Sequence, residues 1–185
     1  MMIQTERTPN PDTLKFLPGK KVSEVGPIEF LKNDKNIKVS LANKILSLEG
    51  TVMVFFGEDF ITVKKEKSLN WEDLKHGIIS EINDYYSKGN EVIIKKEQNK
   101  SDQKTSPNES NEVINKIKEV LDTKVRPAVA KDGGDITFKS YKDGVVTVEL
   151  KGSCSGCPSS IMTHKQGVQN LLCHYIPEVK SVEAI

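Results

Sequence analysis

The pattern of apolar positions in the first half of the chain predicts two helices and several short strands. Regularly spaced apolar residues mark one helical face: Trp71, Leu74, Ile78, Ile82 and Tyr85. Asn70, just before them, is a candidate N-cap. Runs of β-branched and aromatic residues around Gly57 indicate a hairpin. Prolines at 9, 11 and 18 make the opening segment extended. The expected elements are helices at 40–48 and 70–86 and strands at 51–56, 60–65 and 91–96.

The second half shows a similar alternation of helical and strand patterns. A helix is expected over 110–125, ending before Pro127, and the "DGGD" stretch at 132–135 reads as a glycine turn. Two strand patterns, at 136–141 and 145–150, flank Asp143-Gly144, which is a strong hairpin signal. A second helix is expected at 159–176, followed by a closing strand at 178–185. The helix should turn these five residues inward: Ile161, Val168, Leu171, Leu172 and Tyr175.

A polar segment divides these two halves. Residues 97–110, "EQNKSDQKTSPNES", contain no aliphatic or aromatic residue, so they cannot bury enough apolar surface to offset the entropy of ordering. We therefore expect a flexible linker between domains at 1–96 and 111–185. The predicted fold class is α+β. It consists of two small α/β-layered domains, the second with the order helix-strand-strand-helix-strand.

Composition and net charge limit the kinds of partner that the chain is expected to bind. The 185 residues are 36% hydrophobic and 29% charged with a net charge of +1, so nucleic acid and membrane are not expected as partners. The longest strongly apolar run is 52–56, far shorter than a membrane span, and the opening residues lack a secretory signal. We expect a cytoplasmic protein, or a mitochondrial matrix protein if the chain is a processed organellar form.

The chemistry of the chain is concentrated in "KGSCSGCPSS", residues 151–160. Cys154 and Cys157 have the spacing of metal ligands and lie between a predicted strand and a predicted helix. The helix N-terminus favours the thiolate form, which binds metal or attacks a disulfide. Gly152 and Gly156 would let the backbone approach a bulky centre. Two thiolates are too few to complete a metal site, so further ligands are needed.

A zinc site within one chain is disfavoured by geometry. Cys173 follows Cys157 by sixteen positions, which is roughly 24 Å along a continuous helix, whereas a zinc–sulfur bond is about 2.3 Å long. His174 fails for the same reason, and His164 lies about 10 Å along the axis. A zinc-binding interaction module would need the loop to fold back over the helix.

Two other uses of the cysteine pair remain. A thiol–disulfide oxidoreductase uses this spacing, but within a βαβ pattern, whereas here the pair follows a hairpin. Alternatively, a second copy of the chain supplies two more thiolates, and four thiolates suffice for a [4Fe–4S] cluster. A site shared between two copies is easily taken apart, which suits cluster transfer better than storage.

The residues also carry a family resemblance. "RPAVAKDGGDI" (126–136), "GSCSGCPSS" (152–160) and "YIPEV" (175–179) closely resemble the NifU C-terminal domain, the Nfu iron–sulfur carrier module. That resemblance runs over about 113–185. "TERTPNPDTLKFLPG" (5–19) and "VMVFFGEDFITVKK" (52–65) resemble the Nfu N-terminal domain over about 1–96.

The resemblance implies a non-enzymatic scaffold or carrier. Such a protein binds a [4Fe–4S] cluster, with [2Fe–2S] as a possible intermediate, receives it from upstream donors and delivers it to apo-proteins. The ligands carried over are Cys154 and Cys157, and Cys173 is not needed. His164 departs from the family, which usually has an apolar residue there. We expect a packed or partly exposed histidine on the inner face with Ile161 and Val168, and the alternative is a hydrogen bond that tunes a nearby cluster. The first domain shows no chemistry of its own, so a docking or regulatory role is expected for it.

Overall fold

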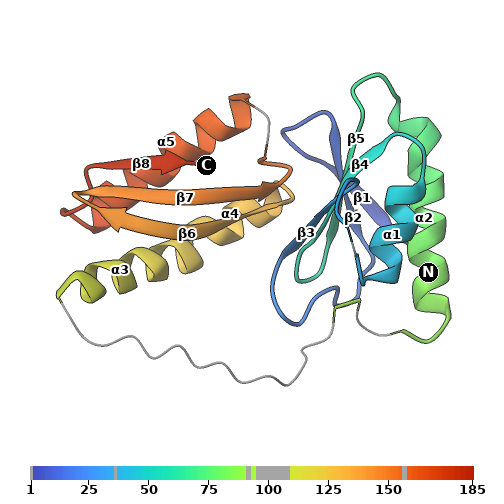
Figure 1. Cartoon of the computed structure of the whole chain (residues 1–185), viewed down its shortest axis with the longest axis horizontal. Helices are drawn as coiled ribbons and strands as arrows, with labels where there is room; N and C mark the ends of the chain where they lie inside the picture. Colours follow the sequence, from blue (N-terminus) through green and yellow to red (C-terminus); the bar gives the residue numbers. More distant parts are fainter. Residues whose placement is uncertain (1, 36, 91–92, 95–108, 156–157) are drawn as a thin grey trace.

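The computed structural model of the chain describes residues 2–35, 37–90, 93–94, 109–155 and 158–185. It contains two sheets, each with its own helices, and the predicted α+β class is confirmed. The end of the second sheet that carries the cysteine loop is directed at the first sheet (Figure 1). Nearly all of the predicted linker, 97–108, lies outside the described residues, and helix α3 begins at Glu109.

The first sheet has five strands in the order β1-β2-β5-β4-β3, and all of its neighbouring strands are antiparallel. The strands are β1 (Gln4–Arg7), β2 (Thr13–Leu17), β3 (Ile28–Leu31), β4 (Thr51–Phe56) and β5 (Ile61–Lys65). Helices α1 (Ser40–Ser47) and α2 (Trp71–Ser87) cover one face of this sheet.

Alternation along the strands gives this sheet two different faces. On the helix side, Phe16, Val54, Ile61 and Val63 pack with apolar residues of α1 and α2 into one core. The residues between them, including Thr62 and Phe55, point to the opposite face, where Phe55 joins a separate small cluster. That opposite face is the one that meets the second sheet.

Most predictions for the first half are confirmed. The two helices and the hairpin at 51–56 and 60–65 are present. Asn70 occupies the N-cap position, but its side chain makes no cap hydrogen bond. Three strands were not predicted. β2 lies in the opening segment that was expected only to be extended, and β1 and β3 are each four residues long without regular alternation. Of the strand expected at 91–96, only Ile93 and Ile94 are described, and Ile94 forms an isolated bridge with Ser23.

The second sheet has three strands, β6 (Gly134–Lys142), β7 (Val145–Gly152) and β8 (Ser181–Ala184). β6 and β7 form the predicted hairpin, and its two turn residues, Asp143 and Gly144, have φ values of 52° and 84° as a type I′ turn requires. β8 lies parallel to β7. Helices α3 (Glu109–Val120), α4 (Arg126–Lys131) and α5 (Pro158–Tyr175) pack with the buried side of β7 into the second core.

Two predictions for the second half were wrong. The first helix does not end before Pro127, because a π-helical turn, η1 (Leu121–Val125), connects α3 to α4. In that turn the N–H of Arg126 bonds the carbonyl of Leu121, and Pro127 falls in the first turn of α4, where its missing N–H costs nothing. Tyr175 was expected to face inward but is 51% exposed at the end of α5.

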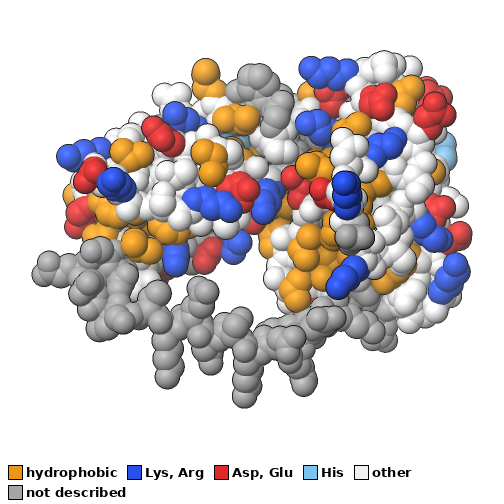
Figure 2. All heavy atoms as spheres, in the orientation of Figure 1, with side chains coloured by type: hydrophobic (Ala, Val, Ile, Leu, Met, Phe, Trp, Pro, Cys, Tyr) orange, Lys and Arg blue, Asp and Glu red, His pale blue; other side chains and the backbone are white. Residues whose placement is uncertain are grey.

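The surface carries both signs of charge. In Figure 2, lysine and arginine side chains alternate with acidic ones over both parts of the visible face, without a patch of one sign. No helix in the described part of the chain is long and apolar enough to cross a membrane.

Candidate functional site

Cys154 lies in the loop between β7 and α5, as predicted, but its side chain points inward. Its exposure is only 1%, and it belongs to the second hydrophobic core. A cluster shared between two copies needs its ligands at the surface, and this inward-facing thiol does not meet that requirement. Cys157 lies outside the described residues.

The "DGGD" turn forms the other half of the cysteine site. Gly133 has a φ of 79°, which confirms the glycine turn. A Cβ on the next residue, Gly134, would lie 2.8 Å from the Sγ of Cys154 and 2.6 Å from the carbonyl oxygen of Lys151. Glycine at 134 therefore lets the thiol pack directly on the backbone of β6. The signal in the sequence was the second glycine, because a turn requires only one.

Ser153 ties the cysteine loop to this turn. Its hydroxyl donates to the carbonyl of Asp132, and its backbone N–H donates to the carbonyl of Gly133 at 3.2 Å. The same hydroxyl lies 3.7 Å from the Sγ of Cys154. Ser155 closes the loop, because its N–H and its hydroxyl both bond the carbonyl of Gly152 at 3.2 and 2.9 Å. The loop up to Ser155 is thus a hydrogen-bonded turn.

Charged residues flank the site without entering it. Asp135 is buried and accepts a hydrogen bond from Arg126 at 2.9 Å, and Asp122 pairs with the same guanidinium at 3.0 Å. Burial alone would lower the pKa of Arg126, but the hydrogen bond and charge of Asp135, with the charge of Asp122, raise it overall. This ion pair fastens α4 to β6 beside Gly134.

His164 is neither a ligand of the described site nor a simple core residue. Its side chain is 15% exposed, and its Nε2 lies 3.5 Å from a carboxylate oxygen of Asp132. The prediction of a packed or partly exposed histidine is therefore confirmed, and its ring lies beside the "DGGD" turn. Its position next to Asp132 places it against the same turn that Ser153 holds.

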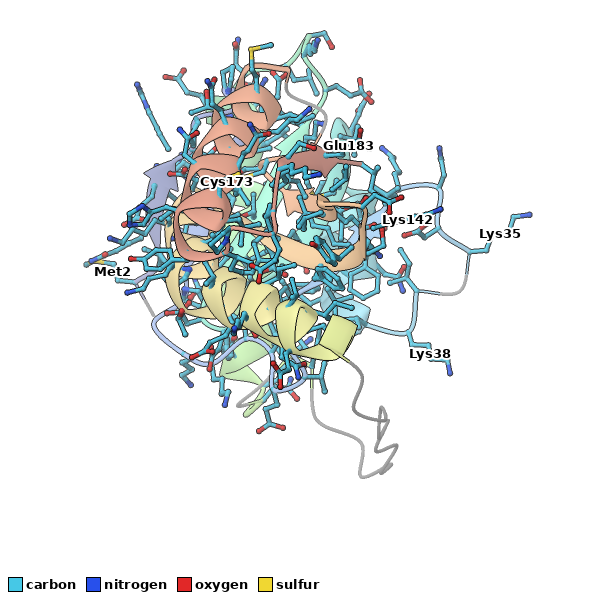
Figure 3. The ribbon with its side chains drawn as sticks, turned by 90° about the vertical axis from the view of Figure 1, so that its left-hand side faces the viewer. Met2, Lys35, Lys38, Lys142, Cys173 and Glu183 are labelled. Carbon is cyan, nitrogen blue, oxygen red and sulfur yellow. The ribbon has the colours of Figure 1, made fainter. Side chains whose placement is uncertain are left out.

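The remaining candidate ligands are distant from the loop. Cys173 packs at the edge of the second core, on the uninterrupted helix α5 (Figure 3). His174, next to it, contacts the ring of Tyr175. Among the residues that the structure describes, no group of three His, Cys, Asp or Glu side chains could hold a metal ion. The continuous helix supports the geometric argument against zinc bound within one chain.

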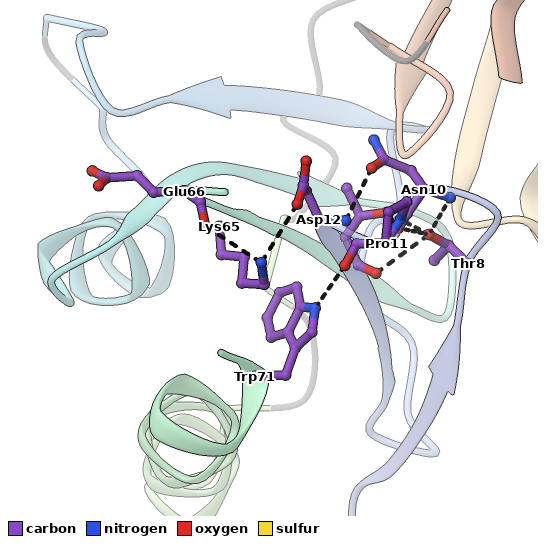
Figure 4. A network of polar contacts seen from close by, with 8 residues as sticks. Thr8, Asn10, Pro11, Asp12, Lys65, Glu66 and Trp71 are labelled. Carbon is purple, nitrogen blue, oxygen red and sulfur yellow. Dashed lines mark hydrogen bonds and ion pairs between the residues drawn. The ribbon is translucent and has the colours of Figure 1, made fainter. Parts of the chain in front are cut away.

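In the first domain, Trp71 holds the segment 8–12 rather than only filling the core. Its indole N–H donates to the carbonyl of Pro11 at 3.1 Å, and the ammonium of Lys65 lies 5.8 Å from the ring centre and 3.4 Å from Asp12 (Figure 4).

The Asn10 amide, in the middle of this segment, donates to the carbonyl of Ser153 in the cysteine loop at 3.2 Å. This connection leaves no local pattern in the sequence, because 143 positions separate the two residues.

Replacing Trp71 with Phe tests this role. The N–H donor is lost and a smaller phenyl ring replaces the indole, so we expect a loss of at least about 0.5–1 kcal/mol in the free energy of unfolding, from the hydrogen bond and from reduced packing. Denaturant unfolding of the whole chain measures this change. An unchanged midpoint would mean that the bond to Pro11 does not hold the segment.

Comparison with known proteins matches both parts of the chain. Residues 3–89 match the family described as scaffold protein Nfu/NifU N terminal, and residues 117–183 match the NifU-like domain. The solution structure of a NifU-like protein from Saccharomyces cerevisiae is 29% identical with a TM-score of 0.47, covering 52% of this chain and 87% of that one.

Two full-length relatives extend this match over the whole chain. The human protein named "NFU1 iron-sulfur cluster scaffold homolog, mitochondrial" is 46% identical, over 100% of this chain and 72% of its own length. "NifU-like protein 4, mitochondrial" from Arabidopsis thaliana is 42% identical, over 99% of this chain and 65% of its own. The chain thus spans about two thirds of these relatives, and it belongs to the Nfu/NifU family.

Proposed function

We propose that the chain is a carrier of iron–sulfur clusters, with the cluster as its cargo and Cys154 and Cys157 as the ligands that it supplies. The observation that carries this proposal is the 46% identity, along the whole chain, to a human protein named an iron–sulfur cluster scaffold. The human relative is named a scaffold rather than an enzyme, so we propose no catalytic turnover. Domains at 1–96 and 111–185 remain part of the proposal.

The cluster would bridge two copies of the chain. A [4Fe–4S] cluster takes four thiolates, and each chain offers two at this loop. Cys173 sits on α5, packed at the edge of the second core, so it is a poor source of a third ligand. A second copy is the simplest way to complete the set.

The burial of Cys154 adds a step to this mechanism. An iron ligand must be a thiolate that faces the cluster, whereas this side chain packs among Leu150, Val168 and other core residues. The loop from Gly152 must therefore turn the thiol outward, with loss of its proton, before a cluster binds. Release to an apo-protein would then proceed by exchange of these thiolates for cysteines of the target.

Partners and location follow from the same proposal. The chain would receive clusters from upstream donors and deliver them to apo iron–sulfur proteins. The two relatives are mitochondrial by name, which agrees with a processed organellar form, while the cytoplasmic location remains a prediction.

Iron and sulfide analysis after anaerobic reconstitution tests the cargo. One [4Fe–4S] cluster per two chains gives about two irons and two sulfides per chain, and a bridging [2Fe–2S] cluster gives about one of each. The loaded chain should then transfer its cluster to a colourless apo [4Fe–4S] protein. The target gains a cluster, and the chain loses its visible absorbance. One zinc per chain would support the zinc module instead. Metal-free turnover of a disulfide substrate would support the oxidoreductase.

A further inference from the structure

Side chains of the first domain bond the backbone that precedes Cys154 and the backbone of the neighbouring "DGGD" turn. A carboxylate oxygen of Glu29 in β3 accepts the N–H of Gly152 at 2.7 Å, and the hydroxyl of Thr62 in β5 donates to the carbonyl of Gly133 at 2.8 Å. The amide of Asn10 donates to the carbonyl of Ser153. Three separate segments of the first domain thus bond the turn and the loop that enclose the thiol.

The residues that make these contacts are buried rather than exposed. Thr62, in the strand β5, is 0% exposed, and Asn10, in the turn between β1 and β2, only 3%. Nearby, Met53, Phe55 and Phe60 form a small apolar cluster that packs against Ala130 of α4. Polar and apolar contacts therefore cover the cysteine site together.

Two glycines allow this close approach. A Cβ on Gly133 would lie 2.8 Å from the Thr62 hydroxyl, and one on Gly152 would lie 3.2 Å from the ring of Phe55. Lys15, which is also buried, reaches across to the carbonyl of Lys131 at 3.4 Å. The two domains can therefore lie this close because the first domain contacts backbone atoms of the second domain that no side chain shields.

We propose that the first domain is a removable cap on the cysteine loop, closed in the cluster-free chain and displaced when the cluster and the second copy arrive. This inference rests on the proposed function. The face that the cap covers carries the backbone around Cys154, so a second copy cannot reach the thiol from that side while the cap is in place. The cap also holds the loop in the conformation that keeps the thiol buried.

Charge couples the two events. A [4Fe–4S] core held by four thiolates carries net negative charge, and it would sit beside the Glu29 carboxylate. The N–H of Gly152, now bonded to Glu29, is a donor that the sulfides of a cluster would compete for. Cluster binding therefore weakens the cap, and by thermodynamic reciprocity a weaker cap strengthens cluster binding.

The test uses the full chain with two interface substitutions, Glu29→Ala and Thr62→Lys. Both lie in the first domain and leave the cysteine loop unchanged. The matched control, Ser47→Lys with Glu49→Ala, makes the same change in net charge on exposed residues at and just beyond the end of α1, which covers the opposite face of the sheet. Glu29→Ala alone is a milder variant in case the lysine prevents folding.

The first readout is the rotational tumbling of the two domains in the cluster-free chain, from ¹⁵N relaxation. The wild type and the control should show one shared correlation time, and the interface variant two. The amide resonance of Gly152 should shift in the variants that lack Glu29, because its acceptor is gone. Independent tumbling of the wild-type domains would overturn the proposal.

The second readout is the chain concentration at which half of the loaded protein is a cluster-bridged dimer. We expect the interface variant to reach this point at a concentration at least about fivefold lower than the wild type or the control. Uncoupled domains with an unchanged midpoint would contradict the capping role while the carrier function stands. If no protein binds a cluster but the wild-type domains tumble together, the proposed function fails and the docked interface remains.

Discussion

Replacing Cys154 or Cys157 with Ser should abolish stable cluster binding while the chain still folds. Each substitution leaves a bridged pair of chains with two thiolates instead of four, and a serine hydroxyl is a much poorer ligand for iron. For Cys154→Ser we also expect a loss of about 1–2 kcal/mol in stability, because a hydroxyl replaces a thiol that is 1% exposed in the core. Visible absorbance after reconstitution and thermal unfolding measure the two effects separately.

Cys173→Ser is the matched control for these variants. Cys173 packs at the edge of the second core on α5, away from the loop, so the substitution should keep full iron content. Loss of the cluster in Cys173→Ser, or retention of it in Cys154→Ser, would show that the ligands are assigned wrongly.

Replacing Gly152 with Ala should strongly destabilise the second domain and its cysteine loop. Its φ is 71°, a conformation that costs an alanine roughly 1–2 kcal/mol. The new Cβ would also lie 2.7 Å from the carbonyl oxygen of Gly133 and 2.9 Å from the Cα of Gly134, so backbone must move. With the cost of overpacking added, we expect a loss of at least about 2 kcal/mol and a fall in Tm of roughly 10 °C.

Gly167→Ala, in the same domain, should raise stability rather than lower it. Gly167 lies in α5 with nothing within 4 Å of a new Cβ, so alanine should stabilise the helix by about 0.5–1 kcal/mol. Differential scanning calorimetry of both variants compares them directly. A Tm for Gly152→Ala within a degree or two of the wild type would contradict the tight packing of the loop against β6.

The elements that sequence predicted well are those with a strong local pattern. Helix α2 and the hairpin at Asp143-Gly144 follow from periodicity and turn chemistry, which act over a few residues. The helix through Pro127 was missed because a short π-helical turn, with bonds such as that from the Arg126 N–H to the Leu121 carbonyl, leaves no periodic signal.

The candidate site was predictable only in part. Cys154 was found from its spacing to Cys157, and its place between β7 and α5 was correct. Its burial was not, because it depends on Gly134 and on the residues of the second core, which come together around the thiol only in the folded chain. Glu29, Asn10 and Thr62 are ordinary polar residues in sequence. Their role appears only when strands more than 70 positions away meet the loop.

The most direct test of the carrier proposal is native mass spectrometry of the full chain after anaerobic reconstitution with iron and sulfide. The account predicts two chains plus the mass of one [4Fe–4S] cluster, and only metal-free chain when Cys154 is replaced by Ser. A single chain that holds one zinc ion, or a chain with no metal under conditions that load a known carrier, would contradict it.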